Sequence, residues 1–275
     1  MRPVAVCGSL NMDVIGYAER LPHAGQTVLG SRLAHTPGGK GANQAVAAAR
    51  AGAPVSLFGA CGRDADGDRA LAALAEAGVN TSGVTRTDVP TGVAIVLVDR
   101  DGENMIVAIP GANEHVAPPP RVQAAVWLTQ GEVPLAAVEG TLAAARDAAA
   151  TAVVNPVPAG RLPPSLVARF DIAVVNETEL AALGAEHPPA VVLTLGRRGV
   201  RLLPDGIDLA PFPAAAVDST GAGDALIGAM AAALAEARPL AESVRFGMAA
   251  AALSVERPGA QPAMPDRAEI ERLLG

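Results

Sequence analysis

The stretch Ala216–Ala225, AVDSTGAGDA, carries the residue types that a group-transfer site needs. A carboxylate, two hydroxyls and a Gly-Ala-Gly turn precede Asp224, and the apolar run Ala225–Ala237 follows it with helical spacing. This order predicts a strand-to-helix turn that opens a helix. Its backbone N–H groups at Gly221–Gly223 lack intrahelical partners, so we expect them to bind an anion at the positive end of the helix dipole.

Asp224 lies directly beside this expected anion site. A carboxylate is a poor phosphate ligand but a good proton acceptor. The stretch therefore predicts phosphoryl transfer, with amide donors for the migrating group and Asp224 as base for the attacking hydroxyl. A structural alternative is that Asp224 is only an acid in the first turn of a helix, because short Gly-rich motifs also occur by chance.

A second Gly-rich stretch, Thr36–Gln44 with the sequence TPGGKGANQ, leads into the Ala-rich run Ala45–Ala51. We expect a loop at another helix start. It is not a Walker A loop, because Lys40 is followed by glycine and the glycine required five residues earlier is missing. Lys40, Asn43 and Gln44 suit a ligand rich in hydroxyl groups, although a plain turn before a helix explains the same pattern.

Composition narrows the function classes. The 275 residues carry a net charge of −7 and no basic block, which disfavours nucleic acid as a partner. No uninterrupted apolar run reaches the roughly 18 residues of a membrane span, and no signal peptide is recognisable. Cys7 and Cys61 stand alone, without metal-binding or disulfide spacing. These features favour a protein of the reducing cytoplasm.

Strand-like and helix-like runs alternate along most of the chain, which predicts a mostly parallel sheet with helices on both faces. We expect strands at Val4–Leu10, Val55–Cys61, Ala125–Thr129, Ala152–Asn155, Ile172–Asn176, Val191–Leu195 and Val200–Leu203. We expect helices at Ala45–Ala51, Gly67–Ala77, Leu135–Ala150, Glu177–Leu183, Ala225–Ala237, Leu240–Val255 and Asp266–Leu274. Polar residues follow several strands, at the edge where open parallel sheets bind ligands.

Two β-rich segments, residues 13–36 and 91–110, do not follow this alternation of strands and helices. Asp99–Gly102 between two such runs signals a hairpin. We expect a small sheet that forms a lid across the ligand end of a single α/β domain spanning residues 1–275. Because a second sheet with partly apolar faces must bury them, we also expect a homodimer through the lid.

Three motifs together resemble the ribokinase-like (PfkB) family of sugar and nucleoside kinases. They are GGKGANQA at Gly38–Ala45, NETE at Asn176–Glu179 and DSTGAGDA at Asp218–Ala225. The resemblance covers essentially the whole chain and is strongest to the ribose kinases of the family, through Gly111–Asn113 and Arg257–Pro262 among others. It implies a doubly wound α/β fold and an ATP-dependent phosphotransferase acting on the terminal hydroxyl of a small sugar, D-ribose above all. Another sugar or a nucleoside as substrate, or a non-catalytic sugar-binding relative, stay as alternatives.

The resemblance also implies roles for matching residues. Asp224 would be the base, with an anion hole at Gly221, Ala222 and Gly223. The sugar would contact Asn11, Met12, Asp13, Gly39, Lys40, Gly41, Ala42, Asn43 and Glu132. ATP would contact Asn176, Thr194, Leu195, Gly196, Arg197, Arg198, Gly199, Gly223, Asp224 and Met248. Asn176 and Glu179 would serve Mg²⁺, and a K⁺ activator would bind at Asp218, Thr220, Ser254, Arg257, Gly259 and Ala263.

One connection departs from the family pattern. Leu183 to Val191 is very short, where the family usually has a further helix. We therefore expect one face of the sheet near the nucleotide to be thinly covered.

Overall fold

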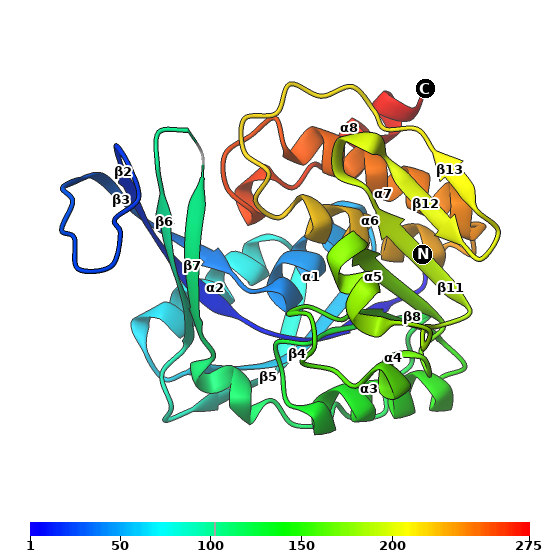
Figure 1. Ribbon diagram of the computed structural model, residues 1–275. Coiled ribbons are helices and arrows are strands. Elements are labelled where there is room, and N and C mark those ends of the chain that lie inside the picture. The colour runs from blue at the N-terminus through cyan, green and yellow to red at the C-terminus, as the bar shows by residue number, and fades with distance from the viewer. Residues whose placement is uncertain (102) are drawn as a thin grey trace.

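A computed structural model describes residues 1–101 and 103–275 (Figure 1). In this part of the chain, nine strands form the main sheet. In spatial order they are β13 (Ile207–Leu209), β12 (Val200–Leu203), β11 (Ala190–Thr194), β10 (Ile172–Asn176), β9 (Thr151–Asn155), β8 (Val126–Gln130), β1 (Val4–Cys7), β4 (Val55–Gly62) and β5 (Val79–Thr87). Neighbours pair in parallel except at the β11–β12 and β12–β13 edges, which are antiparallel.

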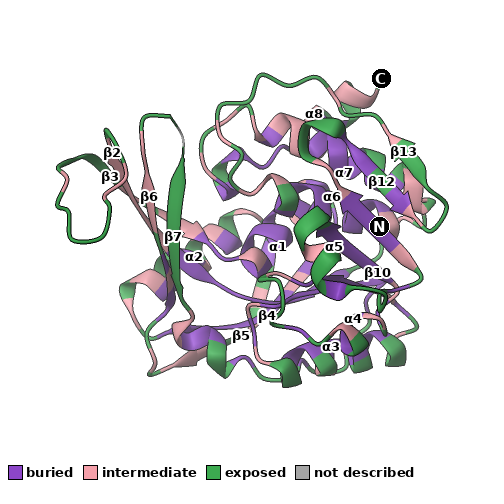
Figure 2. Cartoon of the chain, in the orientation of Figure 1, coloured by how far each residue is buried: buried purple, intermediate pink, exposed green. Residues whose placement is uncertain are grey.

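Helices cover both faces of this sheet, so the predicted doubly wound α/β fold is confirmed. One face packs against α1 (Lys40–Arg50), α2 (Ala65–Glu76), α6 (Ala222–Ala235), α7 (Leu240–Ser254) and α8 (Arg267–Leu274). The other packs against α3 (Leu135–Asp147), α4 (Pro164–Val167) and α5 (Glu177–Leu183). Figure 2 shows the central strands between these layers as buried. The carboxyl ends of the parallel strands lie at one edge, where the polar residues of the motifs follow them.

The second sheet contains β3 (Gly30–Gly38), β2 (Asn11–Ala18), β6 (Gly92–Val98) and β7 (Asn104–Ile109), in that order. It extends to one side of the main sheet (Figure 1). Strands β2 and β6 run parallel, and β6 and β7 form the expected antiparallel pair. Gly102, the last residue of the expected hairpin turn, lies outside the described residues. The expected small sheet is therefore present, and every residue of β7 is exposed (Figure 2).

Both Gly-rich stretches differ in detail from the expectation. Strand β3 continues to Gly38 and α1 already begins at Lys40, so Thr36–Gln44 is not a loop. The expected strand before Asp218 is wrong: the segment from Pro211 to Val217 is irregular, and Val217 is 70% exposed. Its prolines have no N–H to give to a sheet.

The pattern missed two strands, β5 and β13, both at edges of the main sheet. β5 has the sequence VNTSGVTRT and is largely part-buried or exposed, so it lacks the apolar run of the central strands. Edge strands of this kind carry a weak sequence signal because only one side pairs and little of them is buried.

We expected the sheet face near Leu183–Val191 to be thinly covered. This prediction is wrong for β11 and holds only for β12 and β13. Val191 and Val192 are fully buried, and Leu183 of α5 packs in the same core as Val191. Beyond β11, on β12 and β13, Arg201 and Asp208 form an exposed ion pair with N–O distances of 2.6 and 2.9 Å. The outer strands thus present charged side chains to solvent where a further helix would otherwise pack.

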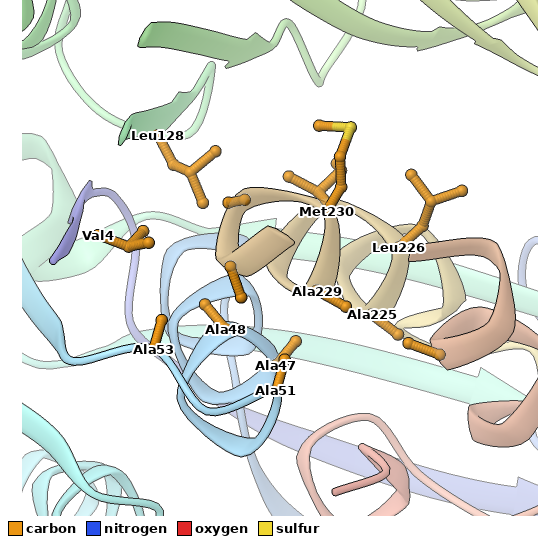
Figure 3. Packing of buried hydrophobic residues seen from close by; sticks show 14 of the residues in the cluster. Val4, Ala47, Ala48, Ala51, Ala53, Leu128, Ala225, Leu226, Ala229 and Met230 are labelled. Atoms are coloured by element: carbon orange, nitrogen blue, oxygen red, sulfur yellow. The ribbon is translucent and has the colours of Figure 1, made fainter. Parts of the chain in front are cut away.

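Helices α1 and α6 cross at very short range, and this crossing sets the geometry of the site. Figure 3 shows Ala47 and Ala48 of α1 beside Ala225 and Ala229 of α6. A Cβ at Gly228 would lie 2.4 Å from the Gln44 carbonyl oxygen and 2.5 Å from the Ala47 Cβ. Only glycine fits there, because both neighbours belong to or adjoin the helix backbone.

We expect Gly228→Ala to destabilise the protein by about 1–3 kcal/mol, because the new methyl group forces α1 and α6 apart. Intrinsic helix propensity alone predicts the opposite sign, a gain of about 0.5–1 kcal/mol. Urea unfolding of the two proteins measures the difference. A variant as stable as the parent, or more stable, would contradict the close crossing.

Candidate active site

A cleft opens at the carboxyl edge of the main sheet, where α1, α5 and α6 begin. It is lined, among others, by Lys40, Asn176, Glu179, Thr194, Gly221, Ala222, Gly223 and Asp224. These residues come from four of the motifs or strand ends singled out in the sequence. The fold therefore brings together the two Gly-rich stretches, which are about 180 residues apart along the chain.

Asp224 lies on the first turn of α6 and is 8% exposed. Its Oδ2 accepts a hydrogen bond from Asn43 Nδ2 at 3.0 Å, and its Oδ1 accepts one from Gln44 Nε2 at 2.9 Å. Burial raises the pKa of the Asp224 carboxyl, and the charge of Lys40 and the two amide donors oppose this without cancelling it. A partly desolvated carboxylate whose pKa is raised is a better proton acceptor than one in water.

The turn before Asp224 differs from the expected row of three free amides. Gly221 adopts a left-handed conformation with φ of 76°, and the Ala222 amide donates to the Ser219 carbonyl at 3.2 Å. Among the described residues, the amides of Gly221, Gly223 and Asp224 have no protein acceptor. The anion-binding capacity is therefore retained, but Ala222 is not one of its free donors.

Glu132 and Ser9 hold the start of α1. Ser9 Oγ donates to Glu132 Oε2 at 2.5 Å, and the Lys40 amide donates to the same oxygen at 3.3 Å. Lys40 Nζ lies 4.0 Å from Glu132 Oε1. Burial alone would lower the pKa of Lys40, but the carboxylates around it outweigh burial and raise the pKa, with Asp224 first among them. The Lys40 side chain is therefore a charged ammonium in the cleft that also contains the anion-binding turn.

Asp13 and Asn11 lie on β2, where the small sheet meets the main one. Asn113 donates from Nδ2 to Asn11 Oδ1 at 2.7 Å, which orients the Asn11 amide. Asp13 Oδ1 is buried and has no hydrogen-bond partner in the described part of the chain. Burial, helped by Glu132 and then Asp224 and opposed by Lys40, raises the pKa of Asp13 to about 7. Such a carboxylate is suited to accept hydrogen bonds from ligand hydroxyls.

Gly39 shows why the GGKG run is glycine-rich. Its φ is 88°, and a Cβ there would lie 2.8 Å from both the Asn11 nitrogen and the Ser9 oxygen. Met12 and Ala42, two further predicted sugar contacts, are each 1% exposed. They line the interior rather than offering polar groups.

Asn176 and Glu179 form a capping box at the start of α5. The Asn176 amide and side-chain nitrogen each donate to the Glu179 carboxylate at 2.9 Å, and Asn176 Oδ1 accepts from the Glu179 amide at 2.9 Å. Both side chains line the cleft. The Asn-x-x-Glu spacing therefore has a structural role in addition to any role toward a ligand.

The other predicted nucleotide contacts divide into two groups. Thr194 lines the cleft, and the turn Leu195–Gly199 follows it, with η2 at Gly196–Arg198. Met248 is 6% exposed and belongs to the hydrophobic core around α7.

The two segments predicted to bind K⁺, one around Asp218 and the other around Gly259, lie side by side. Asp218 accepts hydrogen bonds from the Thr220 amide at 2.9 Å and the Gly259 amide at 2.8 Å. Burial would raise the pKa of Asp218, but the Thr220 side chain and these two amides outweigh burial and lower the pKa. Of the other positions, Arg257 pairs with Glu269, Ser254 is fully buried, and Ala263 ends the turn η3 (Gln261–Ala263).

Comparison with known proteins agrees with this geometry. Residues 1–267 match the model of the pfkB family carbohydrate kinases. The chain belongs to the pfkB family of carbohydrate kinases. It is 36% identical over 295 residues to the ribokinase of Bacillus subtilis, covering 100% of both chains.

Solved structures of ribokinases share the fold. The structure of Arabidopsis thaliana ribokinase complexed with ribose and ATP matches with a TM-score of 0.87 and 32% identity, covering 99% of this chain and 98% of the other. Thermotoga maritima ribokinase matches with a TM-score of 0.88 and 30% identity, covering 100% and 99%. As a pfkB carbohydrate kinase, the protein is a phosphotransferase with an alcohol group as acceptor.

Several polar residues of this kinase site were not among the predicted contacts. Gln44 belongs to the GGKGANQ motif, but only its hydrogen bond to Asp224 shows what it does. Ser9 and Asn113 hold Glu132 and Asn11 in place. Gln44 and Asn113 stand in stretches that the sequence singled out, but their roles could not be predicted, because the partners of all three residues are about 100 or more residues away.

The raised pKa of Asp13 gives a testable pH dependence. Because its folded-state pKa is about 7 and its ordinary value is 3.8, Asp13 costs stability once the pH exceeds its ordinary value, and this cost grows until the pH passes about 7. We expect the wild type to lose stability relative to Asp13→Asn between about pH 4 and 7, by at most about 1.4 kcal/mol per pH unit. Urea unfolding of the two proteins measures the free energy of unfolding at each pH. If the two curves run parallel from pH 4 to 7, the raised pKa of Asp13 is refuted.

Proposed function

We propose that this protein is an ATP-dependent ribose kinase that produces ribose 5-phosphate. The observation that carries the proposal is the buried carboxylate of Asp224 beside the free amides of the α6 N-terminus, in a cleft shared with Lys40, Asn176 and Glu179. The ribokinase relatives support ribose and ATP as the substrates. A non-catalytic sugar-binding protein would have no use for a desolvated base on an anion-binding turn.

In the proposed reaction, Asp224 accepts the proton of the terminal hydroxyl of ribose while that oxygen bonds to the γ-phosphorus of ATP. The bond from phosphorus to the bridging oxygen breaks, and ADP leaves. The amides of Gly221 and Gly223 and the ammonium of Lys40 stabilise the charge on the transferring group. Asn11, Asp13, Asn43 and Glu132 bind the sugar hydroxyls with carboxylate and amide groups.

Mg²⁺ accompanies ATP in this proposal and neutralises charge on its phosphates. Mg²⁺ keeps several waters and takes one or two carboxylates besides phosphate oxygens. Glu179 and Asn176 fit this demand, because they face the cleft and Glu179 retains acceptor capacity beyond its capping bonds. They would therefore hold Mg²⁺ through its waters.

We also propose that residues 1–275 act as one kinase domain, with the small sheet as a lid. Asn11 and Asp13 on β2 belong to this sheet and to the sugar site. A lid that carries sugar contacts would exclude water when the sugar binds, which protects ATP from hydrolysis.

The test of the proposed base is Asp224→Asn. General-base catalysis typically contributes about 10²–10⁴-fold, so we expect kcat for ribose to fall at least about 10²-fold while ribose and ATP still bind. The melting temperature should hardly fall, because the variant removes a desolvated charge. A variant that phosphorylates ribose at near the wild-type rate would overturn the role of Asp224.

An ATP-consumption screen tests the substrate separately. Wild-type protein with Mg²⁺ is offered pentoses, hexoses and nucleosides at equal concentration. The highest kcat/KM should be for D-ribose. Turnover of a nucleoside or hexose in preference to ribose would leave the kinase site intact and reject ribose.

We propose that the protein forms a homodimer through the lid. Cross-strand register places Leu33, Ile95, Met105, Val107 and Ile109 on one face of the small sheet, and each is at least 42% exposed. Asp13 points to the opposite face. An apolar face of this size is expected to be covered by a second copy.

Light scattering tests the dimer. Val107→Glu should shift the protein from dimer to monomer at micromolar concentration. Ile106→Glu is the matched control, because Ile106 is 59% exposed against 61% for Val107 but lies on the other face. A monomeric wild type, or equal effects of the two variants, would contradict the proposed interface.

We propose that K⁺ activates the enzyme through the loops joined by Asp218. Its carboxylate ties the Thr220 turn to Gly259, so a cation bound there would order the segment that leads into α6. Activity should rise when potassium replaces sodium, and Asp218→Ala should abolish the difference. Equal rates in both salts for the wild type would reject the activation.

We place the protein in the cytoplasm. Cys7 and Cys61 are buried free thiols, and the proposed co-substrate ATP is an intracellular metabolite. In the part of the chain that the structure describes, no helix has the length and apolar character needed to span a bilayer.

A further inference from the structure

Two chains of buried amide side chains end on Asp224. In one, Gln130 Nε2 donates to Gln44 Oε1 at 2.7 Å, and Gln44 Nε2 donates to Asp224 Oδ1 at 2.9 Å. In the other, Gln261 Nε2 donates to Asn43 Oδ1 at 3.1 Å, and Asn43 Nδ2 donates to Asp224 Oδ2 at 3.0 Å. The two outer residues come from different parts of the fold. Gln130 lies at the end of β8, and Gln261 lies in the turn η3.

The direction of these hydrogen bonds follows from the carboxylate. When ionised, Asp224 can only accept, so both inner side chains must turn their NH₂ groups toward it. Their carbonyl oxygens then point away and need donors of their own. Gln130 and Gln261 supply those donors, and a flip of either inner amide would place a carbonyl oxygen against the carboxylate.

The orientation of the Gln130 amide has a cost in stability. It is fully buried, and its Oε1 has no hydrogen-bond partner in the described part of the chain. An unpartnered buried polar oxygen is unfavourable and calls for an explanation. Turning the Gln130 amide over would only bring two oxygens together at Gln44, so the donor function toward Gln44 determines the orientation.

We propose that Gln130 and Gln261 are positioning residues for phosphoryl transfer, which lock the amides of Gln44 and Asn43 so that both donate to Asp224. Neither outer residue bonds to Asp224 itself among the described contacts. With both carboxylate oxygens held, the base has one orientation toward the sugar hydroxyl. This inference rests on the proposed kinase function and adds residues outside the predicted substrate contacts.

The kinetic test uses Gln130→Met and Gln261→Met, which keep the length of the side chain and remove the donor. Each should lower kcat for ribose about tenfold, equal to about 1.4 kcal/mol of barrier. The KM for ATP should stay within about twofold in both variants, and so should the KM for ribose in Gln130→Met, because Gln44 is not one of the proposed sugar contacts.

Thr141→Val is the control for a lost buried polar group. Thr141 is fully buried on α3, where its Oγ1 donates to the Ala137 carbonyl at 2.8 Å, and it is not part of either amide chain. It should leave kcat unchanged. Unchanged kcat in both Gln variants, or a fall in kcat matched by Thr141→Val, would overturn the positioning role.

A second measurement needs no substrate. Gln130→Met is combined with Asp224→Asn in a double-mutant cycle, and the unfolding equilibrium is measured in urea. An asparagine both donates and accepts, so it no longer dictates the direction of the inner amides. Gln130→Met should therefore change the unfolding constant about fivefold more in the wild type than in the Asp224→Asn background.

If the two substitutions have additive effects on the free energy of unfolding, the positioning role of Gln130 is overturned. If the wild type does not phosphorylate ribose but the cycle shows coupling, ribose is rejected as the substrate. The positioning of the inner amides by Gln130 is then still supported. If Gln130→Met does not fold, the same cycle with Gln261→Met decides, since Gln261 lies in a turn rather than at the end of a central strand.

Discussion

The buried carboxylate of Asp224 is the constraint on which the rest of the site depends. A charge that is 8% exposed would be costly without partners, because water no longer solvates it. The side chains of Asn43 and Gln44 donate to it, and the charge of Lys40 favours its ionised form. These groups stabilise the ionised carboxylate, while burial keeps its pKa raised, and the proposed role of Asp224 as a base needs both.

That arrangement requires α1 and α6 to lie almost backbone to backbone. Asn43 and Gln44 on α1 reach Asp224 on α6 only because Gly228, Ala47 and their neighbours let the helices approach closely (Figure 3). The composition, 50% hydrophobic with 2% aromatic residues, agrees with such close packing of small side chains. The alanine-rich core and the chemistry of the site thus have one physical cause.

The sequence was sufficient for the α/β fold, the small sheet and the identity of the motifs, because strand and helix periodicity and strand ends are local properties. It was insufficient where tertiary contacts decide. Helix α1 begins five residues before the expected Ala45, since Ser9 and Glu132 support its first turn from the segments that follow β1 and β8. The direction of the Gln44 amide depends on Gln130, 86 residues away, and no spacing rule shows that.

Glu132 and Asp224 are connected through one helix, α1. Glu132 accepts from Ser9 and from the Lys40 amide, so it fixes the N-terminus of α1. One turn further on, the same helix presents Asn43 and Gln44 to Asp224. A displacement of Glu132 when sugar binds would therefore move the amides that orient the base. Strand β8 ends at Gln130, two residues before Glu132, so the strand that leads to Glu132 also carries the amide that donates to Gln44. In the proposed reaction, a sugar bound at Glu132 would therefore act on the orientation of Asp224 through α1 and β8.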